Sequence, residues 1–352
     1  MAVSSGPNRK LTILITGCSP GGIGAALAIT LHDAGHHVYA SARDPAKLKP
    51  LTDKGITTLP LDISSAASIA SAVSSVSASP AGAAGLDILV NNAAASYSMP
   101  VVDISLDEAR KLFDTNVWGQ IAVTQAFMPL LLQRTSSSSP DSSAPRAWGI
   151  SGLLFGCRQH HQQPMIVNHT SVGSVMPMPF QSVYNASKAA LAMFTQTLRM
   201  EVAPFGVRVV ELKTGGVKTN IIANNNVHKS QSVDGGKGPA TTSTTSPAPP
   251  GAGHLPAHSI YAPARSVVEH ALSQEGLADW GIPPEQWARE VTALLLNGNP
   301  PQVIWKGESA AAAWAALLLP SWLFEGFLKK LSKLDVVERI IGESRQQQQQ
   351  TN

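Results

Sequence analysis

A tyrosine and a lysine that could do chemistry together stand four residues apart, in Tyr184-Asn185-Ala186-Ser187-Lys188. Residues at this spacing lie on one face of a helix, so the ammonium group can lie beside the phenol. A neighbouring positive charge stabilises a phenolate and lowers the tyrosine pKa from about 10 toward working pH. Such a tyrosine can donate a proton to a carbonyl oxygen as hydride arrives, or accept it in the reverse direction. The spacing alone is also compatible with an ordinary surface pair.

Two further polar residues could complete a site for a carbonyl substrate. Ser171 follows the apolar segment 165–170, and its hydroxyl could bind and orient the substrate oxygen. Asn116 lies inside a long helical segment, where a buried amide needs a partner, and it could hold a water molecule that relays protons to Lys188. Taken singly, either residue is explained as well by a serine in a turn or a solvated asparagine in a helix.

A glycine-rich turn, residues 16–24, follows the first apolar segment and opens the first helical one. Gly17 can adopt the positive φ of a tight turn, while Gly22 and Gly24 let the backbone approach a pyrophosphate and the helix pack on the strand. Free N–H groups at the helix N-terminus favour phosphate binding. An ordinary turn between a strand and a helix is the alternative interpretation. The position of this turn at the start of an alternating fold favours a dinucleotide site.

The second apolar segment ends in Ala42-Arg43, where the choice between NAD and NADP is usually made. An NAD site places an acidic residue near this point to bind the ribose 2′-hydroxyl. A small residue followed by arginine leaves room, and a charge, for a 2′-phosphate. Asp44 follows directly, and Arg43 could also be a solvated surface charge. The pattern nevertheless favours NADPH (NADP⁺) as the cofactor.

Six apolar segments are predicted to be buried parallel strands, with helical segments alternating between them. The predicted strands are residues 11–16, 37–42, 57–61, 86–91, 165–170 and 206–212. The predicted helices are residues 23–33, 65–76, 107–132 and 183–202. This alternation indicates an α/β fold with a doubly wound parallel sheet (a Rossmann fold) and right-handed crossovers.

The chain is expected to form one large α/β domain with additions. We predict a flexible N-terminus (1–10), a catalytic Rossmann-fold domain (11–222) with an insertion (134–164), a mobile loop rich in Asn, Thr, Ser, Pro and Gly (223–258), a C-terminal helical extension (259–345) and a disordered glutamine-rich tail (346–352).

Composition excludes several classes of protein. The net charge is +3 and the basic residues are scattered, which argues against a nucleic-acid partner. The two cysteines, Cys18 and Cys157, are too few for a disulfide scaffold and form no CxxC pair. Cys18 is interpreted as a small, reduced filler, and no metal site is expected. The polar N-terminus lacks the apolar run of a signal peptide, so a reducing compartment is expected.

Taken together, these pieces resemble the classical short-chain dehydrogenase/reductase family, from residue 11 to about residue 219. The matching pieces occur in the family's order and spacing, a specific combination: the turn 16–24, Asp62 after the third strand, Asn91-Asn92-Ala93, Asn116, Ser171 and Tyr184-x-x-x-Lys188. The intact set argues against a non-catalytic cofactor-binding scaffold.

The resemblance implies roles residue by residue. The catalytic tetrad would be Asn116, Ser171, Tyr184 and Lys188. The expected cofactor contacts are Gly17, Ser19, Gly22, Ile23, Gly24, Arg43, Asp62 at the adenine, Asn91, Tyr184, Lys188 at the nicotinamide ribose, Val217 and Thr219.

The chain departs from the family pattern at three places. The turn has one extra residue between Gly17 and Gly22, which leaves the role of Gly21 open. Ala94 replaces the glycine that usually ends the Asn-Asn-Ala-Gly motif. Thr214-Gly215-Gly216-Val217 stands where Pro-Gly is customary, in the segment that normally positions the nicotinamide carboxamide.

Subgroup features suggest a lipophilic ketone as substrate. The long turn, Ala42-Arg43 and Thr214-Gly215-Gly216-Val217 resemble a fungal subgroup similar to NADPH-dependent 1-acyldihydroxyacetone-phosphate reductases, and residues 113–119 and 297–305 fit the same subgroup. The implied reaction is reduction of acyl-dihydroxyacetone phosphate to lysophosphatidic acid. A steroid, retinoid or secondary-metabolite ketone is the alternative substrate.

The C-terminal region carries an apolar run, residues 310–319, followed by Pro320, several aromatic residues and three lysines. The run is too short for a bilayer span but suits a segment that lies in a membrane interface or on a lipid droplet. A helix packed over the substrate cleft, or a dimer contact, explains it equally well. We therefore expect the cytoplasmic side of the endoplasmic reticulum or a lipid droplet, and otherwise the cytoplasm. The family resemblance suggests a homo-oligomer.

Overall fold

The computed structural model describes residues 9–137, 163–220, 254–274, 280–320 and 322–351. Most of the predicted insertion (134–164), most of the predicted mobile loop (223–258), nearly all of the predicted flexible N-terminus (1–10) and Cys157 lie outside the described residues. The predictions for these segments therefore stay predictions.

A seven-stranded, fully parallel sheet forms the centre of the molecule, in the order β3-β2-β1-β4-β5-β6-β7. Its strands are β1 (Thr12–Ile15), β2 (His37–Ala42), β3 (Thr57–Pro60), β4 (Ile88–Asn91), β5 (Met165–His169), β6 (Arg208–Thr214) and β7 (Val303–Lys306). The predicted α/β doubly wound fold and its six strands are confirmed. The strand β7 was not predicted, and it brings into the sheet a segment from beyond the predicted domain boundary at residue 222.

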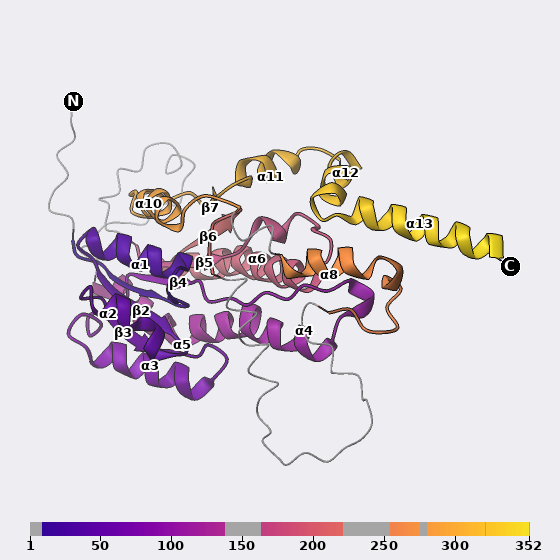
Figure 1. Ribbon diagram of the computed structural model, residues 1–352. Helices are drawn as coiled ribbons and strands as arrows, with labels where there is room; N and C mark the ends of the chain where they lie inside the picture. The colour runs from indigo at the N-terminus through magenta and orange to yellow at the C-terminus, as the bar shows by residue number, and fades with distance from the viewer. Residues whose placement is uncertain (1–8, 138–162, 221–253, 275–279, 321, 352) are drawn as a thin grey trace, which may run out of the picture.

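Helices cover both faces of the sheet (Figure 1). One face carries α1 (Ile23–Asp33) and α10 (Pro284–Leu295), which pack against each other. The other face carries α3 (Ala66–Ala78), α5 (Gln120–Ser137) and α6 (Ser182–Val202); a short helix, α2 (Lys49–Thr52), precedes β3. The helix α10 belongs to the segment predicted as a C-terminal extension, yet it completes the core layer over β6 and β7.

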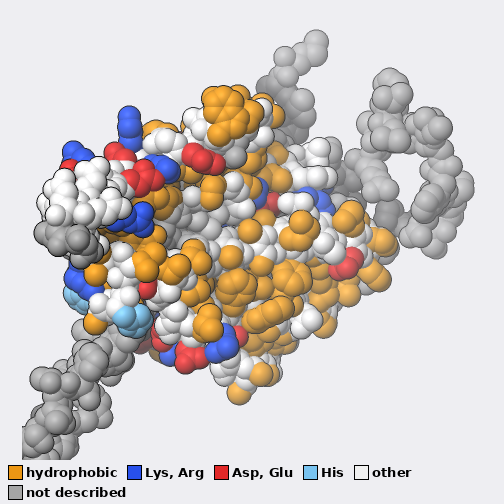
Figure 2. Space-filling model, turned by 90° about the vertical axis from the view of Figure 1, so that its right-hand side faces the viewer, with side chains coloured by type: hydrophobic (Ala, Val, Ile, Leu, Met, Phe, Trp, Pro, Cys, Tyr) orange, Lys and Arg blue, Asp and Glu red, His pale blue; other side chains and the backbone are white. Residues whose placement is uncertain are grey.

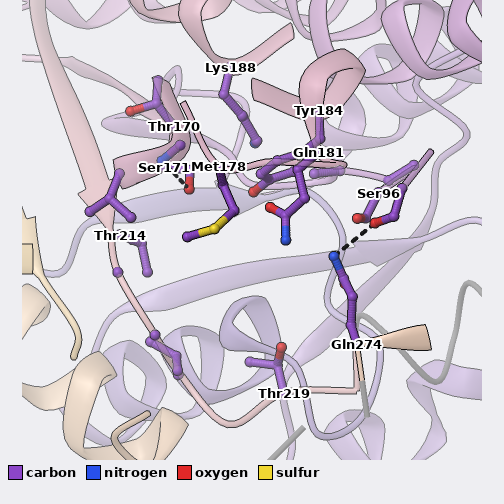
Figure 3. A pocket seen from close by; sticks show the side chains of 18 of the residues that line it. Ser96, Thr170, Ser171, Met178, Gln181, Tyr184, Lys188, Thr214, Thr219 and Gln274 are labelled. Carbon is purple, nitrogen blue, oxygen red and sulfur yellow. Dashed lines mark hydrogen bonds between the residues drawn. The ribbon is translucent and has the colours of Figure 1, made fainter. Parts of the chain in front are cut away.

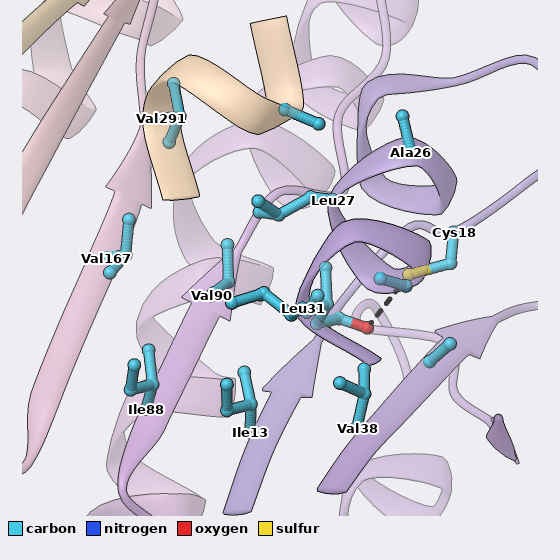
Figure 4. Close-up of a cluster of buried hydrophobic side chains, with 14 of the residues drawn as sticks. Ile13, Cys18, Ala26, Leu27, Leu31, Val38, Ile88, Val90, Val167 and Val291 are labelled. Carbon is cyan, nitrogen blue, oxygen red and sulfur yellow. Dashed lines mark hydrogen bonds between the residues drawn. The ribbon is translucent and has the colours of Figure 1, made fainter. Parts of the chain in front are cut away.

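The core between the sheet and α1 and α10 consists of aliphatic side chains that alternate along the strands (Figure 4). Leu27 and Leu31 of α1 and Val291 of α10 lie over Ile13 and Val90, each no more than 1% exposed. Cys18 is fully buried beside this cluster, and burial raises the pKa of its thiol to about 12. It is therefore an inert filler, as predicted.

The long helical segment predicted at residues 107–132 is interrupted by a wider turn. It consists of α4 (Leu106–Phe113), a π-helical turn (Asp114–Gly119) and α5. A π-helical turn inserts extra backbone into an α-helix and often marks a functional site. Here it carries Asn116.

Among the described residues of the C-terminal part, four further helices lie at the right-hand side and top of Figure 1. They are α8 (Arg265–Ser273), α11 (Ala310–Ala316), α12 (Trp322–Leu331) and α13 (Leu334–Thr351). Val337 of α13 is buried against α8. None of the described helices combines the length and apolarity of a membrane span.

The prediction of a disordered tail at residues 346–352 is wrong for residues 346–351, which continue α13 as a helix. Glutamine is a good helix former, and adding residues to an existing helix is far easier than nucleating one. The first turns of α13 are anchored by packing, so the tract extends them. The sequence prediction used only the amino-acid composition of the tail and did not consider that a packed helix precedes it.

Candidate active site

A cavity of about 1070 Å³ lies at the carboxyl ends of the parallel strands, where the strand order reverses between β1 and β4. Open α/β sheets bind ligands at this switch point. Most of the predicted site residues line the cavity together: Gly17, Ser19, Gly22, Ile23, Arg43, Asp62, Ser171, Tyr184, Lys188, Val217 and Thr219. Three do not: Gly24, Asn91 and Asn116.

The glycine-rich turn has the geometry that its sequence predicts. Gly17 has φ +74°, and a Cβ atom built on it would lie 2.6 Å from the Cα atom of Ala93. A Cβ on Gly24 would lie 2.6 Å from the carbonyl oxygen of Gly17, so Gly24 packs the helix against the turn. Close packing therefore requires glycine at both positions, and Gly17 and Gly22 of this turn line the cavity.

The extra residue of the turn, Gly21, contacts the segment after β6. It has φ +69°, and its carbonyl oxygen accepts a hydrogen bond from the backbone N–H of Asn220 at 3.3 Å. A Cβ on Gly21 would lie 2.3 Å from the Asn220 side-chain nitrogen. The lengthened turn is thus joined to the segment that carries Val217 and Thr219.

Ser171, Tyr184 and Lys188 meet at the wall of the cavity (Figure 3). The hydroxyl of Ser171 accepts a hydrogen bond from the backbone N–H of Gly173 at 3.0 Å and interacts with the Tyr184 phenol. The Lys188 Nζ donates to the carbonyl oxygen of His169 at 2.8 Å and lies 5.8 Å from the centroid of the Tyr184 ring. The three side chains predicted to do the chemistry therefore lie together at one part of the cavity wall.

The structure contradicts the predicted lowering of the Tyr184 pKa. Burial raises the pKa of this phenol and outweighs the opposing hydrogen bond from Ser171. Burial also lowers the pKa of Lys188 to about 8. The sequence argument considered the positive charge of the lysine, which lowers a phenol pKa, but had no measure of burial. Burial disfavours both charged forms, so it raises the phenol pKa and lowers the ammonium pKa.

Asn116 lies behind the cavity wall and is fully buried. Its side-chain oxygen accepts from the backbone N–H of Ala95 at 2.8 Å, and its amide nitrogen donates to the Ala95 carbonyl and the Ser187 hydroxyl, both at 3.0 Å. Asn116 therefore ties the loop after β4 to α6, next to Lys188. Its predicted role in a proton relay stays a prediction.

Asn91 also lies outside the cavity, although the family resemblance implied a cofactor contact. It is 1% exposed, and its amide nitrogen donates to the hydroxyl of Thr124 at 2.8 Å and the side-chain oxygen of Asn168 at 2.9 Å. Successive side chains alternate across a strand, so it is the next residue, Asn92, that lines the cavity. Asn91 instead joins β4, β5 and α5.

A buried ion pair on β6 supports the loop that carries Ser171. Glu211 and Lys213 are 0% and 5% exposed and pair on one face of the strand. Thr170 donates to the Glu211 carboxylate, and Lys213 donates to the Ser174 hydroxyl, each at 2.9 Å. Because Thr170 and Ser174 flank Ser171, the pair holds both sides of the serine loop. Sequence reasoning missed it, although Glu211, in a strand predicted to be buried, and Lys213, just beyond the predicted end of that strand, were a usable signal.

Two basic residues, Arg43 and Lys47, line the cavity beyond the carboxyl end of β2. Lys47 was not predicted, though it stands four residues after Arg43. With the phosphate cradle at the glycine-rich turn, these cations fit a dinucleotide that carries an additional phosphate on its adenine ribose.

Comparison with known proteins agrees with the geometry. Residues 11–138 and 153–230 match the profile of the short chain dehydrogenase family. A short-chain dehydrogenase/reductase of Pestalotiopsis microspora is 41% identical over 94% of this chain and 97% of its own length. The NADPH-dependent 1-acyldihydroxyacetone phosphate reductase of Schizosaccharomyces pombe is 32% identical over 92% of this chain and 94% of its own.

A solved structure supports the fold. The short-chain dehydrogenase from Streptomyces avermitilis superposes with a TM-score of 0.62 at 23% identity, covering 95% of this chain and 98% of its own. The family profile, the near full-length relatives and the assembled serine, tyrosine and lysine agree, and the chain belongs to the short-chain dehydrogenase/reductase family of oxidoreductases.

Proposed function

We propose that this protein is an NADPH-dependent reductase of a lipophilic ketone, most specifically of 1-acyldihydroxyacetone phosphate, which it would convert to 1-acylglycerol 3-phosphate (lysophosphatidic acid). The observation that carries the proposal is the convergence of Ser171, Tyr184 and Lys188 on a cavity whose remaining wall is largely apolar.

The chemistry follows from the side chains. Bound NADPH supplies the hydride. Ser171 donates a hydrogen bond that orients the substrate carbonyl oxygen, and Tyr184 donates the proton that this oxygen takes up. The raised pKa of Tyr184 keeps its phenol protonated at neutral pH, as an acid in a reduction must be. Lys188, held by the His169 carbonyl, places a cation near the phenolate that the transfer leaves.

NADPH is proposed on two grounds. First, Arg43 and Lys47 line the cavity where the adenine ribose of a bound dinucleotide would lie. An NAD site usually has an acidic residue at the end of β2, whereas the cavity-lining carboxylate on that side, Asp62, follows the neighbouring strand β3. Second, the Schizosaccharomyces pombe relative is named as NADPH-dependent.

The substrate side of the cavity suits an acyl chain. Polar side chains such as Ser96, Gln181, His270 and Gln274 line it. Much of the remaining wall is apolar, in part from the C-terminal helices α11 and α12: Met176, Met178, Phe180, Trp280, Ala312, Ala313, Ala316, Phe324, Phe327, Leu328 and Leu331. Lys330 and Lys333 also line it, and among the described lining residues Asp62 is the sole carboxylate. An apolar wall with cations fits an apolar chain that carries an anionic group.

The test is NADPH consumption by the purified protein with 1-acyldihydroxyacetone phosphate and with a panel of steroid, retinoid and secondary-metabolite ketones. We expect turnover of the acyl ketone with NADPH and slower turnover with NADH. Tyr184→Phe is expected to lower kcat by roughly 10²- to 10⁴-fold, the usual contribution of a general acid, without weakening NADPH binding. Turnover of the panel ketones without the acyl ketone would reject the substrate, and full activity of Tyr184→Phe would reject the mechanism.

We also propose that α11 and α12 dock the protein on the cytoplasmic face of the endoplasmic reticulum or on a lipid droplet. Large apolar side chains are exposed at several places on the surface, on α4 and α6 as well as on the C-terminal helices, and Figure 2 shows some of them on one side of the molecule. On α11, α12 and the turn between them the exposed ones are Trp314, Leu317, Leu318, Leu319, Trp322, Leu323, Phe327 and Leu331. Because the same helices line the cavity, a lipid-bound substrate would have a short path into it.

A further inference from the structure

One buried imidazole connects three parts of the cavity wall. The ring of His169, at the end of β5, lies between Asn92 and Thr214: its Nδ1 is 2.9 Å from the Asn92 side-chain oxygen, and its Nε2 is 2.7 Å from the Thr214 hydroxyl. All three residues line the cavity. The carbonyl oxygen of His169 also holds the ammonium group of Lys188.

The hydrogen bonds around Asn92 determine which ring nitrogen of His169 carries the proton. The amide nitrogen of Asn92 donates to the carbonyl oxygens of Thr16 and Gly17, at 2.8 and 3.0 Å. Its side-chain oxygen can therefore only accept, so the Nδ1–H of His169 donates to it. The Nε2 is then an acceptor, and the Thr214 hydroxyl donates to it.

The surroundings keep this imidazole neutral. The ring is stacked on the indole of Trp287, with centroids 5.3 Å apart and planes at 16°. Burial, with a smaller contribution from the Lys188 charge, lowers the pKa of His169 to about 3. A neutral imidazole has one donor and one acceptor, which is what a bridge between an amide oxygen and a hydroxyl requires.

From this bridge we infer that His169 is a positioning residue for the cofactor, which locks Thr214 and the Gly215–Gly216–Val217 segment to Asn92 and the glycine-rich turn. The sites for the pyrophosphate and for the nicotinamide of a bound dinucleotide would then be held at a constant separation by one side chain. The inference rests on the proposed use of NADPH by this cavity.

The bridge also explains a departure from the family pattern. Thr214 stands where proline is customary, and proline has no hydroxyl to donate to the imidazole. The histidine and the threonine are thus a matched pair on neighbouring strands, β5 and β6.

The test compares the NADPH Kd, measured by fluorescence titration, of the full-length protein with that of Thr214→Val, His169→Leu and the double variant. Thr214→Val is nearly isosteric and removes one hydrogen bond of the bridge, and His169→Leu removes both. We expect each to raise the NADPH Kd, by roughly tenfold for Thr214→Val, since one buried hydrogen bond contributes about 1–1.5 kcal/mol. The double variant should be little worse than His169→Leu, because both changes break the same bridge.

The control is His36→Leu. His36 is also buried, at 6% exposure, and accepts a hydrogen bond from the backbone N–H of Leu11 at 3.4 Å, but it lies at the opposite ends of the strands and does not line the cavity. Its variant should lose thermal stability while it keeps the NADPH Kd. His169→Gln, which retains a donor and an acceptor, should recover part of the affinity that His169→Leu loses.

Nitrogen chemical shifts of ¹⁵N-histidine protein test the bridge itself, while the NADPH Kd compared with that of His36→Leu separates its positioning role from a purely structural one. We expect a neutral His169 ring protonated at Nδ1 across the neutral pH range. A ring protonated at Nε2 or on both nitrogens, or unchanged NADPH affinity in both His169→Leu and Thr214→Val, would overturn the inference. If the unaltered protein does not bind NADPH, the proposed function fails instead, so the two failures are distinguishable.

Discussion

At the scale of single residues, burial decides the protonation states of the site. Lys188 is 2% exposed and Tyr184 is partly buried, so burial shifts both groups toward their neutral forms: the phenol pKa is raised, and the ammonium pKa is lowered to about 8. With its raised pKa the phenol is a proton donor at neutral pH, as the proposed reduction requires.

The lowered pKa of Lys188 predicts a pH dependence. Its ammonium form is fully present below about pH 8 and is lost as the pH rises through that value. We expect kcat/KM for NADPH, which reports the free enzyme, to be level below that pH and to decline above it. Any activity that remains in Lys188→Arg should lack this decline, because the guanidinium stays charged. A wild-type profile that stays level up to about pH 10, the range of an ordinary lysine, would contradict the assignment.

At the scale of elements, strand β6 does more than build the sheet. Its buried Glu211–Lys213 pair binds Thr170 and Ser174 and so restrains the loop that carries Ser171. The ammonium of Lys213 also lies 5.6 Å from the ring centroid of Trp305 on β7, so the unpredicted seventh strand covers the pair.

Variants of this ion pair can separate its effect on the free energy of unfolding from its effect on kcat. Lys213→Met leaves the Glu211 carboxylate buried without its partner, which should cost about 3–5 kcal/mol in the free energy of unfolding. The double variant Glu211→Leu/Lys213→Met should recover most of that stability but release the serine loop, and we expect kcat to fall roughly tenfold with NADPH binding retained.

Lys306→Met is a matched control on the adjacent strand. Lys306 pairs with Glu290 at 2.9 Å, but both side chains are about one-third exposed, so the loss should stay below about 1 kcal/mol and kcat should not change. Urea unfolding and steady-state kinetics measure the two effects. Full kcat in the stable double variant would show that the ion pair does not restrain Ser171.

At the scale of the whole molecule, the C-terminal helices α11 and α12 have two surfaces. One lines the cavity, and the other exposes apolar side chains, with Leu318 74% and Trp322 68% exposed. The lysines that follow, Lys329, Lys330 and Lys333, suit the anionic surface of a membrane.

We expect the protein to float with vesicles that contain anionic phospholipid. The variant Leu318→Ser/Trp322→Ser should reduce the bound fraction by roughly tenfold or more, since each apolar side chain that leaves water contributes about 1.5–3 kcal/mol. Neither residue lines the cavity, so turnover of a water-soluble ketone should not change. Met200→Ser is the control, because Met200 is 71% exposed on α6, away from these helices. Equal flotation of all three proteins would reject the proposed docking surface.

The sequence by itself determined the fold class, six of the seven strands and the three residues that meet in the cavity. It could do so because hydrophobic period, glycine geometry and the spacing of Tyr184 and Lys188 are local properties of the chain. The strand β7 was not predicted because it has only four residues, three of them partly exposed, and so shows little hydrophobic pattern. The homo-oligomer stays a prediction.

Only the tertiary structure decided how far each group is buried and what faces it across the sheet. It showed that Asn92 rather than Asn91 lines the cavity, that burial raises the Tyr184 pKa, and that α13 extends through the glutamine tract. It also joined His169 to Asn92 and Thr214, residues 77 and 45 positions away in the chain. Desolvation and contacts between neighbouring strands depend on the packed sheet, and no local pattern in the sequence encodes them.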